Sequence, residues 1–237
     1  MRAAELDPPQ YIFPPLQAVS VPILHSEQRF PIRRVFCVGR NYAEHAKEMG
    51  ASPERGRRPV FFTKPADAVV TDGHATCYPS ATANLHFEVE LVVALHSGGA
   101  NIGIDQALSH VFGYAVGNDL TRRDLQLEAK NAGLPWDISK AFDQSAAISA
   151  IATAENIGHP RAGAITLDVN GTRRQQDDIS QLLWPVPEII HELSKLFCLS
   201  AGDLIFTGTP AGVGALARGD LIIGHIEGVG ELRHSIS

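Results

Sequence analysis

Apolar and polar residues alternate along residues 84–95, NLHFEVELVVAL, with the period of two that is typical of a β-strand. One face of this strand is apolar and is directed into a core: Phe87, Val89, Leu91 and Val93. The opposite face carries His86, Glu88 and Glu90. Neighbouring carboxylates on a half-buried strand are unfavourable unless a cation or a shared proton neutralises them. The pattern therefore indicates either an edge strand with a solvated acidic face or a cation site.

Short apolar runs predict further strands. They lie at residues 33–39, on either side of a bend at Lys64-Pro65 within 58–70, at 111–120, around 167–175 and after the two GDLI segments at 202–205 and 219–222. The dipeptide Asn170-Gly171 is suited to a tight hairpin turn of type I′. The run at 111–120 ends next to Asp119, and a helix signal follows it.

Three helices are predicted from caps and from spacing. The first covers residues 42–49, with Asn41 as its N-cap and Gly50 after its end. The second follows a capping box of Thr121 and Asp124 and ends at Gly133. The third, at residues 186–197, buries four aliphatic side chains: Ile189, Ile190, Leu193 and Leu196. Residues 133–145 show no helical or strand period.

Strands outnumber helices and do not alternate with them regularly, so the fold class is α+β and not a doubly wound parallel sheet. Six of the fifteen prolines fall in residues 1–32, which limits regular structure there to short extended pieces. We therefore expect a proline-rich N-terminal arm over residues 1–32 and one main domain over residues 33–237.

The composition argues against several classes of function. The chain of 237 residues has a formal net charge of −6, which provides no basic field for nucleic acid or for an anionic membrane. Its three cysteines are widely spaced and contain no C-x-x-C pair, so buried free thiols are expected in place of disulfides or a thiolate zinc site. No apolar run approaches the length of a membrane span, and we expect a cytoplasmic protein.

The segment TGTPAGVG at residues 207–214 is rich in glycine but lacks the Lys-Ser/Thr ending of a phosphate-binding loop. Nucleotide binding is therefore not predicted.

Six segments in order along the chain resemble the fumarylacetoacetate hydrolase family. They are VFCVGRNYAEHAKEMG, FFTKPADAVV, NLHFEVELVVAL, GYAVGNDLTRRDLQ, GLPWDISKAFD and LIFTGTPAGVG. The resemblance extends from about residue 33 to the C-terminus, and within the family it is greatest to small acylpyruvate hydrolases. It implies a roll of mixed β-sheets with helices outside, a homodimer, and a bound Mg²⁺ or Mn²⁺ ion.

The same resemblance implies that Glu88, Glu90 and Asp119 are the metal ligands. This agrees with the acidic strand, because carboxylate oxygens are preferred ligands of hard divalent ions. His86 shares the face of the two glutamates, and we interpret it as a residue that orients ligands, since a histidine beside carboxylates more often orients them than binds a hard ion.

Further site residues follow from the resemblance. The helix with His45 and Glu48 is expected to close over bound substrate, and this pair is expected to activate water. Lys140 is assigned to the developing oxyanion. Substrate contacts are expected from Arg123, Gln126 and Thr209. Three more residues are candidates for binding the far carboxylate of the substrate: Arg40, Tyr42 and Lys64. Without the family context, His45 with Glu48 is an exposed i, i+3 pair and these last residues form ordinary surface contacts.

The implied activity is hydrolysis of a carbon–carbon bond in an acylpyruvate, a 2,4-dioxo acid, with 3-fumarylpyruvate of the gentisate route as the expected substrate. Two other enzyme activities of the family need the same metal-bound enolate: decarboxylation of oxaloacetate, and isomerisation or decarboxylation in the homoprotocatechuate route. A protein that only binds a 2-oxo acid is the alternative outside catalysis. The sequence does not decide between acyl groups or between Mg²⁺ and Mn²⁺.

Overall fold

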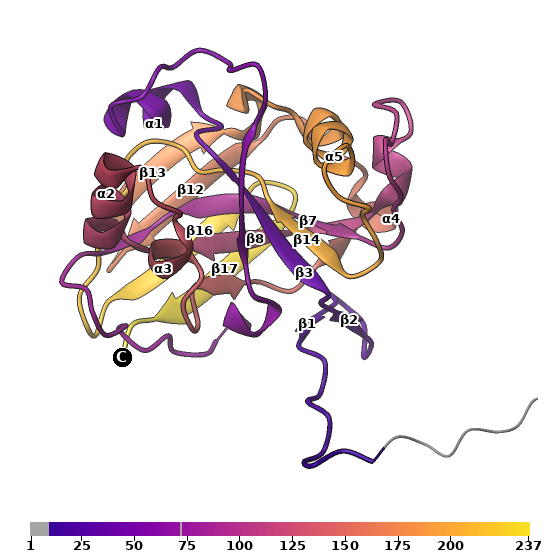
Figure 1. The fold of residues 1–237 in the computed structure, drawn as a ribbon, viewed down its shortest axis with the longest axis horizontal. Coiled ribbons are helices and arrows are strands. Elements are labelled where there is room, and N and C mark those ends of the chain that lie inside the picture. The colour runs from indigo at the N-terminus through magenta and orange to yellow at the C-terminus, as the bar shows by residue number, and fades with distance from the viewer. Residues whose placement is uncertain (1–9, 72) are drawn as a thin grey trace, which may run out of the picture.

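The computed structural model describes residues 10–71 and 73–237. A mixed eight-stranded sheet forms its centre, in the order β4-β3-β14-β7-β8-β10-β5, with β11 paired to β8 (Figure 1). Its strands are β3 (Arg34–Gly39), β4 (Val60–Lys64), β5 (Val69–Thr71), β7 (Val89–Leu95), β8 (Val111–Asp119), β10 (Ala146–Ile148), β11 (Ala152–Thr153) and β14 (Asp203–Phe206). β14 pairs parallel to β3, and β10 parallel to β5, whereas the other pairs are antiparallel.

Three smaller sheets complete the roll. A four-stranded antiparallel sheet has the order β13-β12-β16-β17, and its strands are β12 (Ala164–Val169), β13 (Thr172–Asp178), β16 (Leu221–Ile226) and β17 (Gly230–Ser235). A three-stranded sheet consists of β15 (Gly214–Ala215), β6 (Leu85–Phe87) and β9 (Thr121–Arg122). A hairpin of β1 (Ser20–Pro22) and β2 (Arg29–Pro31) forms the third smaller sheet.

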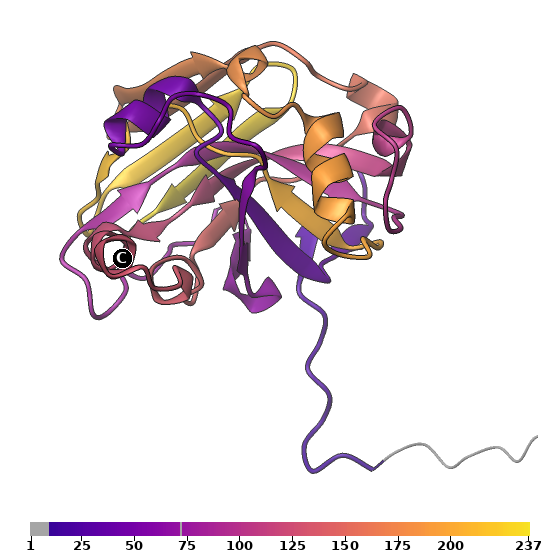
Figure 2. The same cartoon turned by 45° about the horizontal axis from the view of Figure 1, so that its top comes forward.

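The helices are short and lie outside the sheets (Figures 1 and 2). They are α1 (Ala43–Glu48), α2 (Arg123–Ala132), α3 (Asp137–Lys140), α4 (Ala154–Ile157) and α5 (Val186–Ser194), with 3₁₀ turns η1 (Ala66–Ala68), η2 (Ala107–His110) and η3 (Ile179–Gln181). None of the helices in the described part of the chain combines the length and the apolar character that crossing a bilayer requires. The fold is thus α+β, as the sequence predicts.

Both faces of the central sheet are buried. On one face Val89, Leu91 and Val93 of β7 join the larger core, where β12, β16 and β17 pack on β7 and β8. On the other face Val92 and Ala94 join a second core, which the β1–β2 hairpin covers. The carboxylates of Glu88 and Glu90 belong to this second face, because successive side chains of a strand point to opposite sides. They enter the protein interior and not a solvated edge, and both are almost fully buried.

Local expectations from the sequence hold in part. Asn170 and Gly171 both have positive φ, 52° and 77°, so the predicted type I′ turn between β12 and β13 is confirmed. Gly133 ends α2 in the left-handed conformation, also as predicted. The third helix ends earlier than expected, at Ser194, and Leu196 beyond it is exposed, so its predicted burial is wrong. α3 occupies the segment for which no helix was predicted.

Both predicted N-caps are wrong. Asn41 is fully buried and uses its side chain to bond backbone groups of Trp184 and Thr207. The capping box of Thr121 and Asp124 does not form, because the N-cap of α2 is Arg122, which makes no side-chain cap bond. Asp124 instead accepts hydrogen bonds from Thr82 and from the Ala83 N–H, and so fixes the loop before β6. In both cases the polar side chain bonds to residues that are distant in the sequence and does not cap its helix. The expectation of buried thiols is also wrong for Cys77 and Cys198, which are exposed, although Cys37 is buried.

The N-terminal segment, residues 10–18, extends away from the folded domain (Figure 1). Residues 10–18 have no strand or helix, and the chain before β1 runs away from the folded part in both views (Figures 1 and 2). Residues 1–9 of the predicted arm lie outside the described residues. The boundary between arm and domain near residue 32 stays a prediction.

Candidate active site

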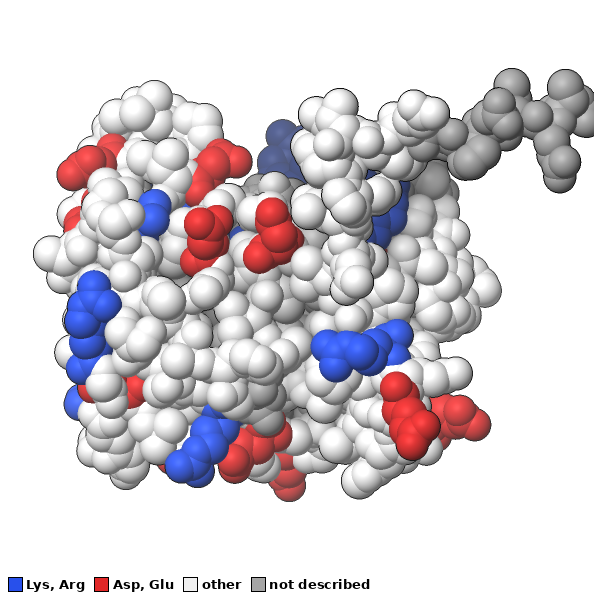
Figure 3. Space-filling model, turned by 90° about the horizontal axis from the view of Figure 1, so that it is seen from below, with Lys and Arg blue, Asp and Glu red and all other residues white. Residues whose placement is uncertain are grey.

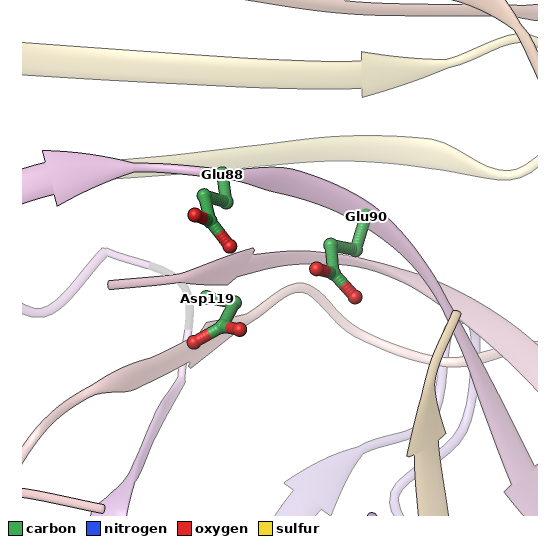
Figure 4. A group of neighbouring side chains, drawn as sticks. All are labelled: Glu88, Glu90 and Asp119. Atoms are coloured by element: carbon green, nitrogen blue, oxygen red, sulfur yellow. The ribbon is translucent and has the colours of Figure 1, made fainter. Parts of the chain in front are cut away.

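Three carboxylates converge where β7 and β8 meet (Figure 4). In this antiparallel pair Val89 faces Asn118 and Glu90 faces Gly117. The Asp119 N–H also donates to the Glu88 carbonyl over 2.8 Å. This register brings the end of β8 beside Glu88, and one carboxylate oxygen from each of Glu88, Glu90 and Asp119 lies within 4.8 Å of the others. The structure therefore brings the three predicted metal ligands together.

Buried cations pair with two of these acids. Lys140 Nζ lies 2.7 Å from both Glu88 Oε2 and Asp119 Oδ2, and Lys64 Nζ lies 2.8 Å from Asp119 Oδ1. Arg123 forms a further ion pair with Glu88. Burial raises the pKa of Glu88, but the Lys140 and Arg123 charges outweigh burial and leave this pKa far below its usual range.

Glu90 is different, because no cation pairs with it among the described residues. Its Oε2 accepts a hydrogen bond of 2.7 Å from the Gly208 N–H, at the loop after β14. Burial and then the charges of Asp119 and Glu88 raise the pKa of Glu90 well above its usual value. An ionised Glu90 in this position needs a positive charge beside it.

The donor set fits a hard divalent ion. Three buried carboxylates with converging oxygens supply the ligand type that Mg²⁺ and Mn²⁺ prefer. Asp119 Oδ1 is paired only with Lys64 among the described residues, and none of them offers a cation to Glu90. A divalent ion would supply the positive charge that Glu90 lacks.

Buried polar residues behind the carboxylates were not predicted from the sequence. Asn118 Oδ1 accepts from the Glu88 N–H over 2.8 Å, and Asn118 Nδ2 lies 2.9 Å from His234 Nε2. Gln175 Oε1 accepts from the Val89 N–H over 2.9 Å, and Gln175 Nε2 donates to Thr209 Oγ1 over 2.8 Å. These bonds fix the backbone on both sides of Glu88. The only hint in the sequence is that polar side chains occupy strand segments.

His45 and Glu48 form one unit on α1. His45 Nδ1 lies 3.1 Å from Glu48 Oε2, and the Gly212 N–H donates to Glu48 Oε1 over 3.1 Å. Burial raises the pKa of Glu48, but the hydrogen bonds from His45 and Gly212 outweigh it and lower this pKa overall. The carboxylate therefore stays ionised beside the ring, and the His45 ring itself is buried. In contrast, the lysine of the same helix, Lys47, forms an exposed pair with Glu44.

A cavity of about 230 Å³ connects this pair to the three carboxylates. Ten of the twelve predicted site residues line it: Arg40, His45, Glu48, Glu88, Glu90, Asp119, Arg123, Gln126, Lys140 and Thr209. The structure does not place Tyr42 and Lys64 there. Tyr42 is buried against Leu182, and Lys64 lies behind Asp119, where it also donates to the Leu120 carbonyl. Neither side chain is placed to bind a substrate carboxylate.

Arg123, Gln126 and His86 form a small network next to Glu88. Arg123 donates to Gln126 Oε1 and, over 3.3 Å, to His86 Nδ1. Burial, followed by the Arg123 charge, lowers the pKa of His86 to about 4. His86 does not line the cavity. It is therefore a neutral ring that supports Arg123.

Several cavity residues were not predicted. Phe62 and Trp136 form an aromatic wall with ring centroids 5.9 Å apart, and Leu127 and Lys130 of α2 line the same cavity. Their signal in the sequence was weak, because an aromatic residue or a lysine on an amphipathic helix is common without any ligand.

The chain is similar to known proteins in both sequence and structure. A model of the fumarylacetoacetate (FAA) hydrolase C-terminal family matches residues 34–237. Fumarylpyruvate hydrolase from a Ralstonia species is 44% identical over 172 residues, which cover 73% of this chain and 89% of the relative. The mitochondrial oxaloacetate tautomerase FAHD1 of Rattus norvegicus is 42% identical, over 86% of this chain and 91% of the relative.

Solved structures agree with the fold. The crystal structure of fumarylpyruvate hydrolase from Pseudomonas aeruginosa, in complex with Mn²⁺ and pyruvate, is 53% identical with a TM-score of 0.93. That likeness covers 96% of this chain and 99% of the other. A putative fumarylpyruvate hydrolase from Burkholderia cenocepacia is 49% identical with a TM-score of 0.90, over 97% of this chain and 99% of that one.

Proposed function

We propose that this chain, which belongs to the fumarylacetoacetate hydrolase family, hydrolyses a carbon–carbon bond of an acylpyruvate. The favoured substrate is 3-fumarylpyruvate, which gives fumarate and pyruvate. One observation carries the proposal: the His45–Glu48 pair lines the same cavity as the three convergent carboxylates. Relatives named fumarylpyruvate hydrolase support it, one of them crystallised with Mn²⁺ and pyruvate.

We propose that Glu88, Glu90 and Asp119 hold Mg²⁺ or Mn²⁺. When bound, the ion would polarise the oxygens of a 2-oxo acid and stabilise the enolate that leaves. Lys64 stays behind Asp119 and holds this carboxylate in position. Lys140, which reaches both Glu88 and Asp119, is the ammonium group that can turn to an oxyanion forming in the cavity.

His45 and Glu48 prepare the attacking water. With the Nδ1–H of His45 directed to Glu48, Nε2 is the nitrogen that is free to accept a proton. The water oxygen adds to the C4 carbonyl while His45 takes the water proton. Cleavage of the C3–C4 bond then releases the pyruvate enolate, which gains a proton at C3, and fumarate. Arg123, Gln126 and Thr209 orient the substrate in the cavity.

The test is a panel of substrates with the Mg²⁺-supplemented protein. We expect 3-fumarylpyruvate to be cleaved with a higher kcat/KM than acetylpyruvate, and both diketo acids faster than oxaloacetate is consumed. Faster turnover of oxaloacetate than of either diketo acid would overturn the proposal.

A second candidate is enol chemistry on oxaloacetate, which the 42% identity to the oxaloacetate tautomerase favours. Such chemistry, whether tautomerisation or decarboxylation, needs no activated water, so a paired His45 and Glu48 argue for hydrolysis. The same panel separates the two if the enol–keto conversion of oxaloacetate is followed beside its consumption. Tight binding of oxalate or pyruvate without turnover would instead indicate a protein that only binds 2-oxo acids.

We also propose that the chain acts as a cytoplasmic homodimer in the gentisate route. Exposed apolar side chains support an assembly: Tyr11, Ile12, Phe13 and Leu16 on the N-terminal segment are 63–97% exposed. On the face shown in Figure 3, Lys and Arg groups are interspersed with Asp and Glu groups and form no continuous basic field. Light scattering of the full chain should give twice the monomer mass of 25.5 kDa, and a monomer would contradict this part of the proposal.

A further inference from the structure

We infer that Lys130 and Arg40 bind the terminal carboxylate of the acyl chain, so that the cavity selects acylpyruvates whose acyl group is itself a carboxylic acid. This inference rests on the proposed function, because it takes the 2-oxo acid end of the substrate to lie at the three carboxylates.

Helix α2 provides a spacing that can match the two ends of the substrate, the 2-oxo acid and the terminal carboxylate. Four of its residues line the cavity at the i, i+3, i+4, i+7 spacing of a single face: Arg123, Gln126, Leu127 and Lys130. Arg123 pairs with Glu88, which fixes the first turn of this face at the carboxylate cluster. Lys130 follows two turns later, about 10 Å farther along the axis.

The substrate has a matching length. In an extended 3-fumarylpyruvate, five carbon–carbon bonds separate the 2-oxo carbon from the terminal carboxyl carbon, a span of roughly 6 Å. A flexible lysine side chain covers the remaining distance. A carboxylate at that end is therefore within reach of Lys130 when the other end lies beside Arg123.

The cationic side chains of the cavity also support the inference. Four cationic side chains line the cavity, and two of them, Arg123 and Lys140, are paired with the acids of the cluster. Arg40 and Lys130 form no ion pair with any described residue; Lys130 Nζ donates to the Met49 carbonyl over 2.6 Å, and Arg40 lies 5.7 Å from the Trp136 ring centroid. These two cations are thus available to an anionic ligand.

Arg40 is also held in a strained conformation. Its φ is 60°, in the left-handed region that a residue with a long side chain rarely adopts. Next to it, the buried Asn41 side chain bonds to Trp184 and Thr207 and fixes this turn. A turn that is held in this way directs Arg40 to the cavity wall beside Trp136, where it can meet a carboxylate.

The competing explanation for Lys130 is purely structural. Its bond to Met49 ties α2 to the end of α1, so its loss would displace His45 and Glu48 and slow every substrate alike. Recognition of a terminal carboxylate would instead affect only the substrate that has one.

The experiment compares kcat/KM for 3-fumarylpyruvate and for acetylpyruvate, which lacks the second carboxylate. We expect the fumaryl-to-acetyl ratio to fall about 10- to 100-fold in Lys130→Met and in Arg40→Met, mainly through KM for fumarylpyruvate. Lys130→Arg should retain most of the ratio. Lys195→Met, which removes an exposed lysine paired with Glu192 on α5, is the matched control and should leave the ratio at the wild-type value.

One result would overturn the inference: a ratio that stays at the wild-type value in both methionine variants, whether their rates are unchanged or fall equally on both substrates. That result leaves hydrolysis by the wild-type protein, and hence the proposed function, intact. If the wild-type protein cleaves neither diketo acid, the proposed function fails by itself. Calorimetric titration of the two acids onto the Mg²⁺-supplemented protein then tests the inference separately, since a preference for fumarylpyruvate that Lys130→Met removes would support it and no preference would overturn it.

Discussion

The Gly208 N–H donates to Glu90 Oε2 over 2.7 Å, and it is the hydrogen bond that orients the one acid of the cluster without a cationic partner among the described residues. Gly208 has a φ of +103°, and a Cβ at this position would lie 2.7 Å from Asn41 Cβ. The backbone that presents the N–H therefore requires glycine.

Gly208→Ala should displace this N–H and weaken its hydrogen bond to Glu90. We expect at least a tenfold loss of Mn²⁺ affinity by calorimetry, together with a destabilisation of about 1–3 kcal/mol. Gly219→Ala is the matched control, because Gly219 has a φ of +90° and no atom of the described residues lies within 4 Å of an added Cβ. Equal metal affinity in both variants would show that the Gly208 contact does not matter.

Glu90→Gln should make the protein more stable than the wild type without metal, and should remove the stabilisation that Mg²⁺ gives to the wild type. The folded pKa of Glu90 is raised, so ionising it costs stability as the pH rises above its unfolded value of 4.5. Without metal, the melting temperature of Glu90→Gln should therefore exceed that of the wild type by a few °C at pH 7, and by less near pH 4.5. Saturating Mg²⁺ should raise the wild-type melting temperature and leave that of the variant unaffected. A variant that is less stable without metal would contradict this account of Glu90.

His45→Ala should slow acylpyruvate hydrolysis by roughly 10²- to 10⁴-fold, because water then lacks its proton acceptor. Metal affinity should be retained, since His45 is not among the ligands. Calorimetry with Mn²⁺ and steady-state rates on the same preparation separate the two effects. A joint loss of metal binding and rate would assign His45 to the structure of the site.

The lowered pKa of Glu48 makes a testable prediction for the pH dependence of the His45–Glu48 pair. Its pKa is lowered, so its carboxylate should remain ionised at pH values where an ordinary glutamate is already protonated. Acidification from pH 7 to pH 5 should therefore not remove activity through Glu48. Glu48→Gln should lower kcat across the whole range. Unchanged kcat in this variant would exclude Glu48 from orienting His45.

His234 should make folding sensitive to acid. Burial lowers its pKa to about 4 from the usual 6.5, so the unfolded chain binds more protons between these values and stability rises with pH across them. The full effect is on the order of 3 kcal/mol. His234→Gln can still meet Asn118 and should flatten the melting temperature between pH 4 and 6.5. His225→Gln on the exposed face of the neighbouring strand β16 should not. Parallel pH curves for all three proteins would contradict this role.

Local patterns predicted the acidic strand and the hairpin turn correctly, because alternation and turn chemistry are set by neighbouring residues. Asn41 shows where this reasoning ends: its residue type suits an N-cap, but partners more than 140 positions away use its side chain. Lys64 was expected at the substrate and instead lies behind Asp119, because the sequence does not give the order of β4, β3 and β14 in the sheet. The sequence does not predict Lys130 as a cavity residue, since nothing local distinguishes it from a solvated helix residue.

The central claim is tested most directly by following product release against metal occupancy. Protein stripped with a chelator and then titrated with Mg²⁺ should release pyruvate and fumarate in equal amounts from 3-fumarylpyruvate, at a rate that rises with the binding of one ion per chain and stays at background in Asp119→Asn. Undiminished cleavage by the stripped protein, or full occupancy by the ion with no cleavage, would contradict the account.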